Sequence, residues 1–200
     1  SQIQREVTRM IEKVKANVEA SYNALLKGEG ASLEEIEETE EYIDYLNTEI
    51  SRYIVRLMSV EMSEDDTRRI NNYYLALSNI ERIGDHAMNI AEYTKNMKKW
   101  DISFSDDART EIKKMKQVSM NILDVIDFTD ATTPAAQLET ISKYEFLMDD
   151  MEKKYRKRQI KRAKKGDCKA ESGILFSELL TDFERIGDYA LNIGELHADM

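Results

Sequence analysis

A twelve-residue stretch that occurs twice constrains this chain more than any other feature. Residues 81–92 read ERIGDHAMNIAE and residues 184–195 read ERIGDYALNIGE, so nine of the twelve positions are identical at a constant offset of 103. Two copies of one supersecondary unit are the direct interpretation of such an internal repeat. We therefore expect two structurally equivalent halves, residues 1–99 and residues 100–200.

Both copies have the periodicity of amphipathic helices. Apolar residues recur at spacings of three and four through each copy, which is the pattern of a helix with one face against a core. At about 100° per residue, Glu81 and Asp85 fall on nearly the opposite side, as do Glu184 and Asp188. Each helix should therefore bury one side and present a row of carboxylates on the other.

Composition favours long helices. The 200 residues include one proline and seven glycines, so few residues would interrupt a helix. Ser32, Ser63 and Ser105 are the predicted N-caps of the second, third and fourth helices. The predicted helices span about residues 2–27, 33–58, 64–99, 106–127, 135–163 and 169–200. Short connections make neighbouring helices antiparallel, so the expected fold is all-α, with two tandem antiparallel three-helix bundles.

Charge and cysteine content narrow the functional classes. With 39 acidic and 29 basic residues the net charge is −10, which disfavours nucleic-acid binding because the summed field repels phosphate. The single cysteine, Cys168, forms no disulfide framework and suits a reducing cytosol. The sequence contains no signal peptide and no apolar run of about 18 residues. Its first residues resemble the middle of a protein, so we expect a domain of a longer chain, whose membrane portion lies elsewhere.

A second acidic pair occurs in each half. Glu40 and Asp44 correspond to Glu145 and Asp149 at an offset of 105, so the chain has four Glu-x-x-x-Asp pairs. This spacing places both carboxylates on one helix face, where a multivalent cation would relieve their repulsion. Hard oxygen ligands suit Ca²⁺, Mg²⁺, Mn²⁺ or iron. The candidate metal ligands are Glu40, Asp44, Glu81, Asp85, Glu145, Asp149, Glu184 and Asp188.

A plainer interpretation of these acids is solubility, because acidic residues at this spacing are common on solvated helix faces. Repetition of both pairs in register, together with Asn89 and Asn192, favours a functional site. The same repetition would also arise from common ancestry alone. Arg82 and Arg185 are repeated too, and they are placed to neutralise part of each acidic row.

The two dodecamers closely resemble the signature of PhoU domains, which regulate bacterial phosphate uptake. The resemblance covers most of the chain, as two three-helix repeats with paired acidic motifs. It implies that the eight acids hold multinuclear clusters of iron, zinc or a similar metal on the bundle surface. It also implies a non-catalytic regulatory domain that acts on phosphate transport.

The segment MSVEMSEDDTRRINNYY at residues 58–74 departs from stand-alone PhoU proteins. It is more similar to the PhoU-like cytoplasmic tail of bacterial sodium/phosphate cotransporters. This resemblance implies a position at the inner face of the plasma membrane, beside a phosphate transporter or a fused transmembrane domain. The alternatives are a stand-alone adaptor between a phosphate transporter and a signalling kinase, and a carboxylate-bridged metalloenzyme.

Other residues are weaker candidates for chemistry. Tyr189 replaces His86 in the second copy and His197 lies on an apolar stripe, so we expect neither histidine to be a ligand. No nucleophile–base constellation or phosphate loop is apparent, so no catalytic residue is predicted. The basic run Lys153–Lys165 is either the solvated end of a helix, favoured by the helix dipole, or a contact with anionic lipid or an acidic partner.

Overall fold

The structure is a computed structural model that describes residues 1–27, 33–129 and 131–200. Its helices are α1 Gln2–Lys27, α2 Leu33–Met58, α3 Glu64–Trp100, α4 Asp106–Val125, α5 Pro134–Lys164 and α6 Ala170–Ala198. The described residues contain no strand, so the all-α prediction is confirmed. The predicted helix ends lie within two residues of the observed ones.

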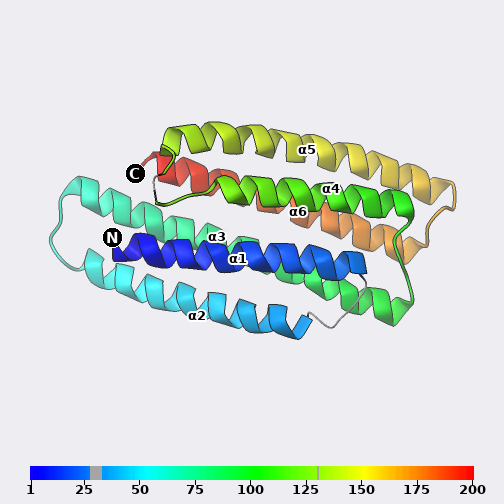
Figure 1. Ribbon diagram of the computed structural model, residues 1–200, viewed down its shortest axis with the longest axis horizontal. Helices are drawn as coiled ribbons and strands as arrows, with labels where there is room; N and C mark the ends of the chain where they lie inside the picture. Colours follow the sequence, from blue (N-terminus) through cyan, green and yellow to red (C-terminus); the bar gives the residue numbers. More distant parts are fainter. Residues whose placement is uncertain (28–32, 130) are drawn as a thin grey trace.

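The two three-helix units lie side by side. Helices α1–α3 form one unit and α4–α6 the other, with α2 and α5 at the two outer edges (Figure 1). Helix α3 packs on α6, and α1 packs on α4. The helices of each of these pairs run in opposite directions.

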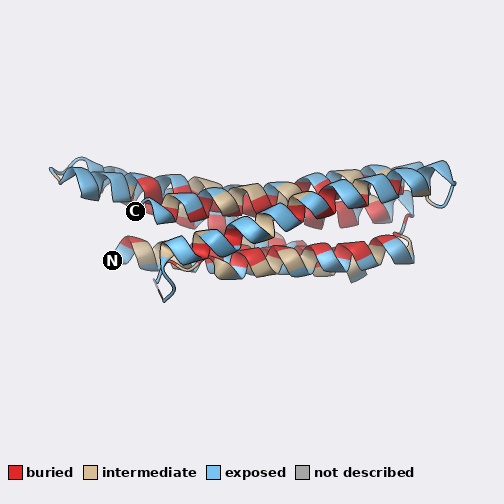
Figure 2. Cartoon of the chain, turned by 90° about the horizontal axis from the view of Figure 1, so that it is seen from above, coloured by how far each residue is buried: buried red, intermediate tan, exposed pale blue. Residues whose placement is uncertain are grey.

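A single core joins the two units. Buried residues lie mostly on the sides of the two helix layers that face each other, and exposed residues lie mostly on the outer surfaces (Figure 2). Ala76, Ile83 and Ile90 of α3 are fully buried, as the apolar stripe predicts. Near the end of α2, Ile54 is buried and its neighbour Tyr53 is only partly covered. Because the core is continuous, each unit completes the burial of the other.

Side-chain caps fix where the helices begin. The Ser63 hydroxyl accepts a hydrogen bond from the Asp66 amide at 3.1 Å and donates one to the Asp66 carboxylate at 2.9 Å. Ser105 caps α4, and Thr133 caps α5 ahead of Pro134. The predicted cap at Ser32 lies outside the described residues. Each cap satisfies a backbone N–H that the first helical turn leaves unpaired.

None of the described helices is both long enough and apolar enough to cross a membrane.

Candidate metal centre

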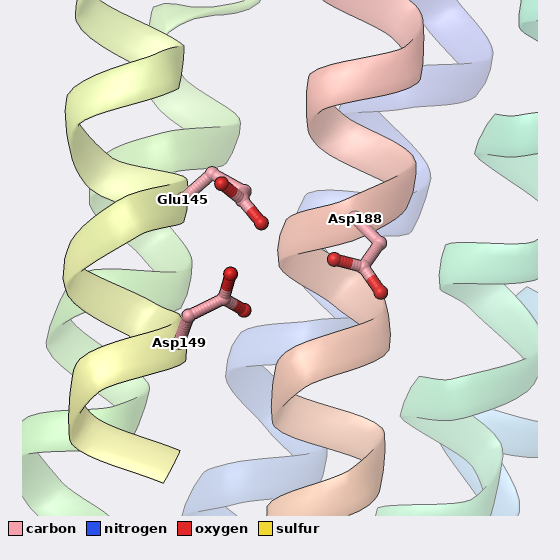
Figure 3. A group of neighbouring side chains, drawn as sticks. All are labelled: Glu145, Asp149 and Asp188. Carbon is pink, nitrogen blue, oxygen red and sulfur yellow. The ribbon is translucent and has the colours of Figure 1, made fainter. Parts of the chain in front are cut away.

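The acidic pairs of the second unit converge between α5 and α6. Glu145 and Asp149 project from α5 toward α6, and Asp188 projects from α6 toward them (Figure 3). Each residue contributes an oxygen atom to a group in which all atoms lie within 4.8 Å of one another. All three residues are half-buried. The i, i+4 spacing of Glu145 and Asp149 on α5 and the antiparallel packing of α6 against α5 thus bring the three carboxylates together.

Glu184 is an electrostatic neighbour of the same cluster. Burial raises its pKa, and the carboxylates of Glu152, Asp188 and Asp149 raise it further. Glu152 was not predicted as a site residue, because its position in the first repeat is occupied by Asn47 at the offset of 105. Glu152 is buried and accepts a hydrogen bond from Arg156 Nε at 2.5 Å.

The acidic pairs of the first unit influence one another across α2 and α3, but among the described residues only Glu145, Asp149 and Asp188 of the second unit have oxygen atoms within 4.8 Å of one another. Burial raises the pKa of Glu40 to about 8, with further contributions from the Asp44 and Asp85 carboxylates. Burial and Asp85 also raise the pKa values of Asp44 and Glu81. Asn47 donates a hydrogen bond of 2.9 Å to Glu81. The four predicted ligands of this unit are therefore electrostatic neighbours.

Glycines of the repeated motif allow these helices to approach. A Cβ atom at Gly84 would lie 3.2 Å from Glu40 Oε2, so the missing side chain leaves room for that carboxylate. A Cβ atom at Gly187 would lie 3.0 Å from the sulfur of Met148 on α5. The same motif position therefore faces a carboxylate in one unit and a thioether in the other.

The residues present fit a cation. Both clusters offer carboxylate oxygens alone, the donors that Mg²⁺, Ca²⁺, Mn²⁺ and iron prefer. Burial and the neighbouring Asp149 and Asp188 raise the pKa of Glu145 to about 7, which reflects the cost of holding these charges together. Glu40 Oε2 is buried and has no hydrogen-bond partner. A cation would neutralise both clusters and satisfy that oxygen.

The repeated asparagines do not join the clusters. Asn89 on α3 donates to Asp182 on α6 at 3.1 Å, and Asn192 on α6 donates to Asn79 on α3 at 3.1 Å. These symmetric bonds join the two units, so their repetition has a structural reason. The repeated arginines do act on the clusters. Burial raises the pKa values of Glu81, Glu184 and Asp188, and Arg82 offsets part of the rise at Glu81, as Arg185 does at Glu184 and Asp188.

A buried acid between the units was missed at the sequence level. Asp182 is 3% exposed and accepts hydrogen bonds from His86 Nδ1 at 2.7 Å, from Asn89 and from the Tyr93 hydroxyl. The available signal was an acidic residue inside the apolar stripe of α6. His86 therefore lies at the α3–α6 interface, and His197 is buried against Phe128 with ring centroids 4.9 Å apart.

The basic run of α5 contains arginines that pair with other side chains of the protein and lysines that are exposed to solvent. Arg162 forms a bidentate ion pair with buried Glu111 of α4 at 2.8 and 3.2 Å, and Arg156 is bonded to Glu152 and Ser177. The lysines of the run are exposed. Contact with anionic lipid stays a prediction, and the exposed lysines are the residues able to make it.

Comparison with known proteins agrees with this architecture. The profile of the PhoU domain matches residues 7–94 and 112–196, one segment in each three-helix unit. The chain belongs to the PhoU family. A PhoU homologue of Thermotoga maritima, a phosphate-specific transport system accessory protein, is 26% identical over 199 residues, which is 96% of this chain and 83% of the relative. A PhoU homologue of Aquifex aeolicus is 33% identical over 88 residues, covering 44% of this chain and 40% of the relative.

Two solved PhoU structures have the same fold. PhoU from Pseudomonas aeruginosa superposes with a TM-score of 0.89 at 19% identity, covering 98% of this chain and 93% of the other. The phosphate transport system regulatory protein PhoU from Streptococcus pneumoniae gives 0.85 at 19% identity, with coverage of 98% and 91%. The predicted pair of three-helix bundles is therefore the PhoU fold.

Proposed function

We propose that this chain is a non-catalytic, metal-binding accessory protein that regulates a phosphate transport system. The observation that carries the proposal is the convergence of Glu145, Asp149 and Asp188 on one half-buried site in a PhoU-family chain. The Thermotoga maritima relative is named as an accessory protein and the Streptococcus pneumoniae protein as a regulatory one. Regulation without catalysis is the role that these names support.

The lengths of the relatives favour an adaptor over a cotransporter tail. This chain spans 83% of the Thermotoga maritima protein and 93% of the Pseudomonas aeruginosa chain, so those proteins consist of little beyond the PhoU repeats. By analogy with these relatives, we place this chain on the cytoplasmic side of a phosphate transporter. There it would link the transporter to a signalling kinase. The cotransporter-tail interpretation remains the second candidate, supported by the resemblance of residues 58–74.

The carboxylates would act by holding cations between neighbouring helices. Glu145, Asp149, Glu184 and Asp188 would bind at α5–α6, and the equivalent four acids at α2–α3. The bound ion would supply the positive charge that cancels their repulsion. Iron or zinc follows from the family resemblance, and Mg²⁺, Ca²⁺ or Mn²⁺ from the oxygen donor set. A bound cation can regulate the transporter only if it binds two conformational states of the complex with different affinities.

The metal site is tested by thermal unfolding. After treatment with chelator, Mn²⁺ or Fe²⁺ should raise the melting temperature, because the unfolded chain lacks an assembled site. The pair Asp85→Asn and Asp188→Asn should lose this shift, whereas Asp124→Asn, at an exposed acid outside the clusters, should keep it. Elemental analysis should report bound metal in the wild-type chain and in the Asp124→Asn control, and not in the double variant. An equal shift in the double variant would contradict the assignment.

The regulatory role is tested in the organism that encodes the chain. Deleting the gene should change phosphate uptake, and the intact gene should restore normal uptake. The variant with Asp85→Asn and Asp188→Asn should fold and fail to restore it. Wild-type uptake in the deletion strain would rule out this role. If the upstream coding sequence encodes membrane-spanning segments in the same reading frame, the cotransporter-tail candidate replaces the adaptor.

A further inference from the structure

A cavity of about 380 Å³ lies between α4 and α5, and none of the eight predicted metal ligands lines it. Its lining residues are Asp107, Thr110, Glu111 and Lys114 of α4, and Arg158, Lys161 and Arg162 of α5. Four of these seven residues are basic and two are acidic, in a chain whose net charge is −10. The α4–α5 cavity is therefore a local exception to the acidic character of the molecule.

Contacts within the protein hold the two arginines of the cavity in place. Arg162 donates two hydrogen bonds to the Glu111 carboxylate and two to Gln159 Oε1, which uses four of its five N–H groups. Arg158 Nη1 lies 3.7 Å from Glu111 Oε2, and its guanidinium carbon lies 5.6 Å from the ring centroid of Tyr155. A guanidinium that is already positioned loses less side-chain entropy when it binds a ligand.

Three bases of the cavity lack a counter-charge of their own. They are Lys114, Arg158 and Lys161. The carboxylate nearest to Arg158 is that of Glu111, which is already bonded to Arg162. The two lysines are exposed, and neither forms an ion pair within the described part of the chain. The second acid, Asp107, is exposed in the first turn of α4. The cavity thus keeps an excess of positive charge.

The equivalent groove of the first unit has the opposite charge. At the offset of 105, α1 and α2 correspond to α4 and α5, and a groove of about 200 Å³ lies between them. The acids Glu6 and Glu49 line it, and Arg56 is the one base among its described lining residues. Tyr53 occupies the position that corresponds to Arg158. Repeat ancestry therefore explains a groove at this place, but it does not explain the basic lining of the second one.

The basic lining and the volume of the cavity together indicate the class of ligand. Guanidinium groups bind phosphate oxygens through paired hydrogen bonds, and lysine ammonium groups bind them as point charges. A volume of about 380 Å³ lies within the range of small-molecule sites, which is about 300 to 1,000 Å³. We propose that the α4–α5 cavity binds the phosphate groups of a small molecule that carries a di- or triphosphate.

Phosphate groups reach a protein either in soluble compounds or in the headgroups of anionic lipids. A phosphodiester headgroup carries one negative charge, whereas three bases of this cavity lack a counter-charge. A di- or triphosphate group supplies several charges within the volume of one ligand, so the lining favours the soluble source. The proposal does not depend on the metal clusters, because they lie between other pairs of helices and carry charge of the opposite sign.

Isothermal titration calorimetry with inorganic tripolyphosphate tests the proposal on the full chain after treatment with chelator, which removes metal that tripolyphosphate would bind. The wild-type chain should bind one tripolyphosphate. Lys114→Glu and Arg158→Gln should each weaken binding about tenfold, because each removes a charge-assisted contact. Lys113→Glu makes the same charge change at an exposed neighbour outside the cavity, so it should keep the affinity within about twofold.

Flotation with phosphatidylglycerol vesicles separates the two sources of phosphate. The wild-type chain and Lys114→Glu should behave alike in this assay, because the cavity is expected to take a soluble ligand. Vesicle binding that Lys114→Glu abolishes, in a chain that does not bind tripolyphosphate, would overturn the soluble ligand and assign the cavity to a lipid headgroup.

The calorimetry also has outcomes that overturn the proposal. A wild-type chain that binds no tripolyphosphate, and no vesicles through Lys114, has no phosphate site in this cavity. Equal weakening by Lys113→Glu and Lys114→Glu would show that net charge alone attracts the anion. Tripolyphosphate binding in a chain that Mn²⁺ fails to stabilise would support the phosphate site and contradict only the metal site.

Discussion

Glu40 illustrates how two copies of one motif come to differ at the level of single residues. Its carboxylate lies against Gly84 with one oxygen buried and without a hydrogen-bond partner. The counterpart Glu145 lies with Asp149 and Asp188, all with oxygens within 4.8 Å. A buried polar atom without a partner costs free energy, so the first cluster is the more strained of the two when no cation is bound.

Replacing Glu40 by glutamine should stabilise the metal-free protein near pH 8. The charge that the fold disfavours is removed, and solvent screening of this half-buried group keeps the gain to about 1 kcal/mol. Urea unfolding in the presence of chelator measures the effect. Glu38→Gln, at a nearby exposed acid of α2, should change the free energy of unfolding little. An equal gain in both variants would mean that the benefit comes from lower net charge alone.

The raised pKa values also predict how stability depends on pH. Burial and neighbouring carboxylates raise the pKa of Glu40 to about 8 and that of Glu145 to about 7, from an ordinary value of 4.5. The folded state therefore holds these protons more tightly than the unfolded state. Their contribution to stability is fully present below pH 4.5 and is lost as the pH rises through 7 and 8.

Melting temperatures with chelator should therefore fall as the pH rises from 4.5 to 8, and added Mn²⁺ should reduce the fall. The variant with Glu40→Gln and Glu145→Gln should show a flatter profile, because the two groups with the largest raised pKa values no longer titrate. If the metal-free wild type is instead most stable at pH 8, the clusters are less confined in solution than this structure indicates.

At the level of elements, α5 combines structural and exposed charges in one basic run. Arg162 holds Glu111 of α4, which is 4% exposed, and Arg158 lies 3.7 Å from the same carboxylate. This buried pair anchors α5 to α4. The exposed lysines of the same run have no such partner on α4, so they remain available to a second surface.

Glu111→Gln should lower the free energy of unfolding by about 3 kcal/mol, because Arg162 is left buried without its counter-charge. Lys161→Gln, at an exposed neighbour of Arg162, should stay within about 0.5 kcal/mol of the wild type. Urea denaturation of the three proteins is the measurement. A loss below about 1 kcal/mol for Glu111→Gln would show that water reaches Arg162 and solvates its charge.

At the level of the whole molecule, the two repeats share one core. Helix α3 packs on α6 and α1 on α4, and hydrogen bonds of Asn89 and Asn192 cross the same boundary. A unit taken alone would expose the apolar surfaces that these contacts cover. The sequence boundary between residues 99 and 100 is therefore a boundary between repeats, and we do not expect it to separate independent folding units.

The full chain should unfold in one cooperative transition, and the fragment of residues 1–99 should lack fixed tertiary packing. Far-ultraviolet circular dichroism and tyrosine near-ultraviolet signals of the full chain should change together. The fragment should keep helical signal and lose the near-ultraviolet signal, as a state without specific packing does. Two separate transitions in the full chain would show that the shared core contributes little.

Periodicity and capping are local properties, so the sequence alone determined the helices, the caps at Ser63 and Ser105, and the rows of acids. It also predicted that the pairs of each unit would converge, because an i, i+4 pair and a short loop leave few alternatives. The helices, the caps and the rows of acids depend on residues within a few turns of each other.

Only the tertiary structure determined that the same motif has different surroundings in the two units. Glu40 meets Gly84, Asp182 meets His86 and Glu111 meets Arg162, each on a different helix and tens of residues away in the chain. Helical spacing specifies which side of a helix is apolar, but the partner of each buried charge depends on which helix surfaces meet. Packing of the whole core determines which helix surfaces meet, and the sequence pattern of a single helix does not specify it.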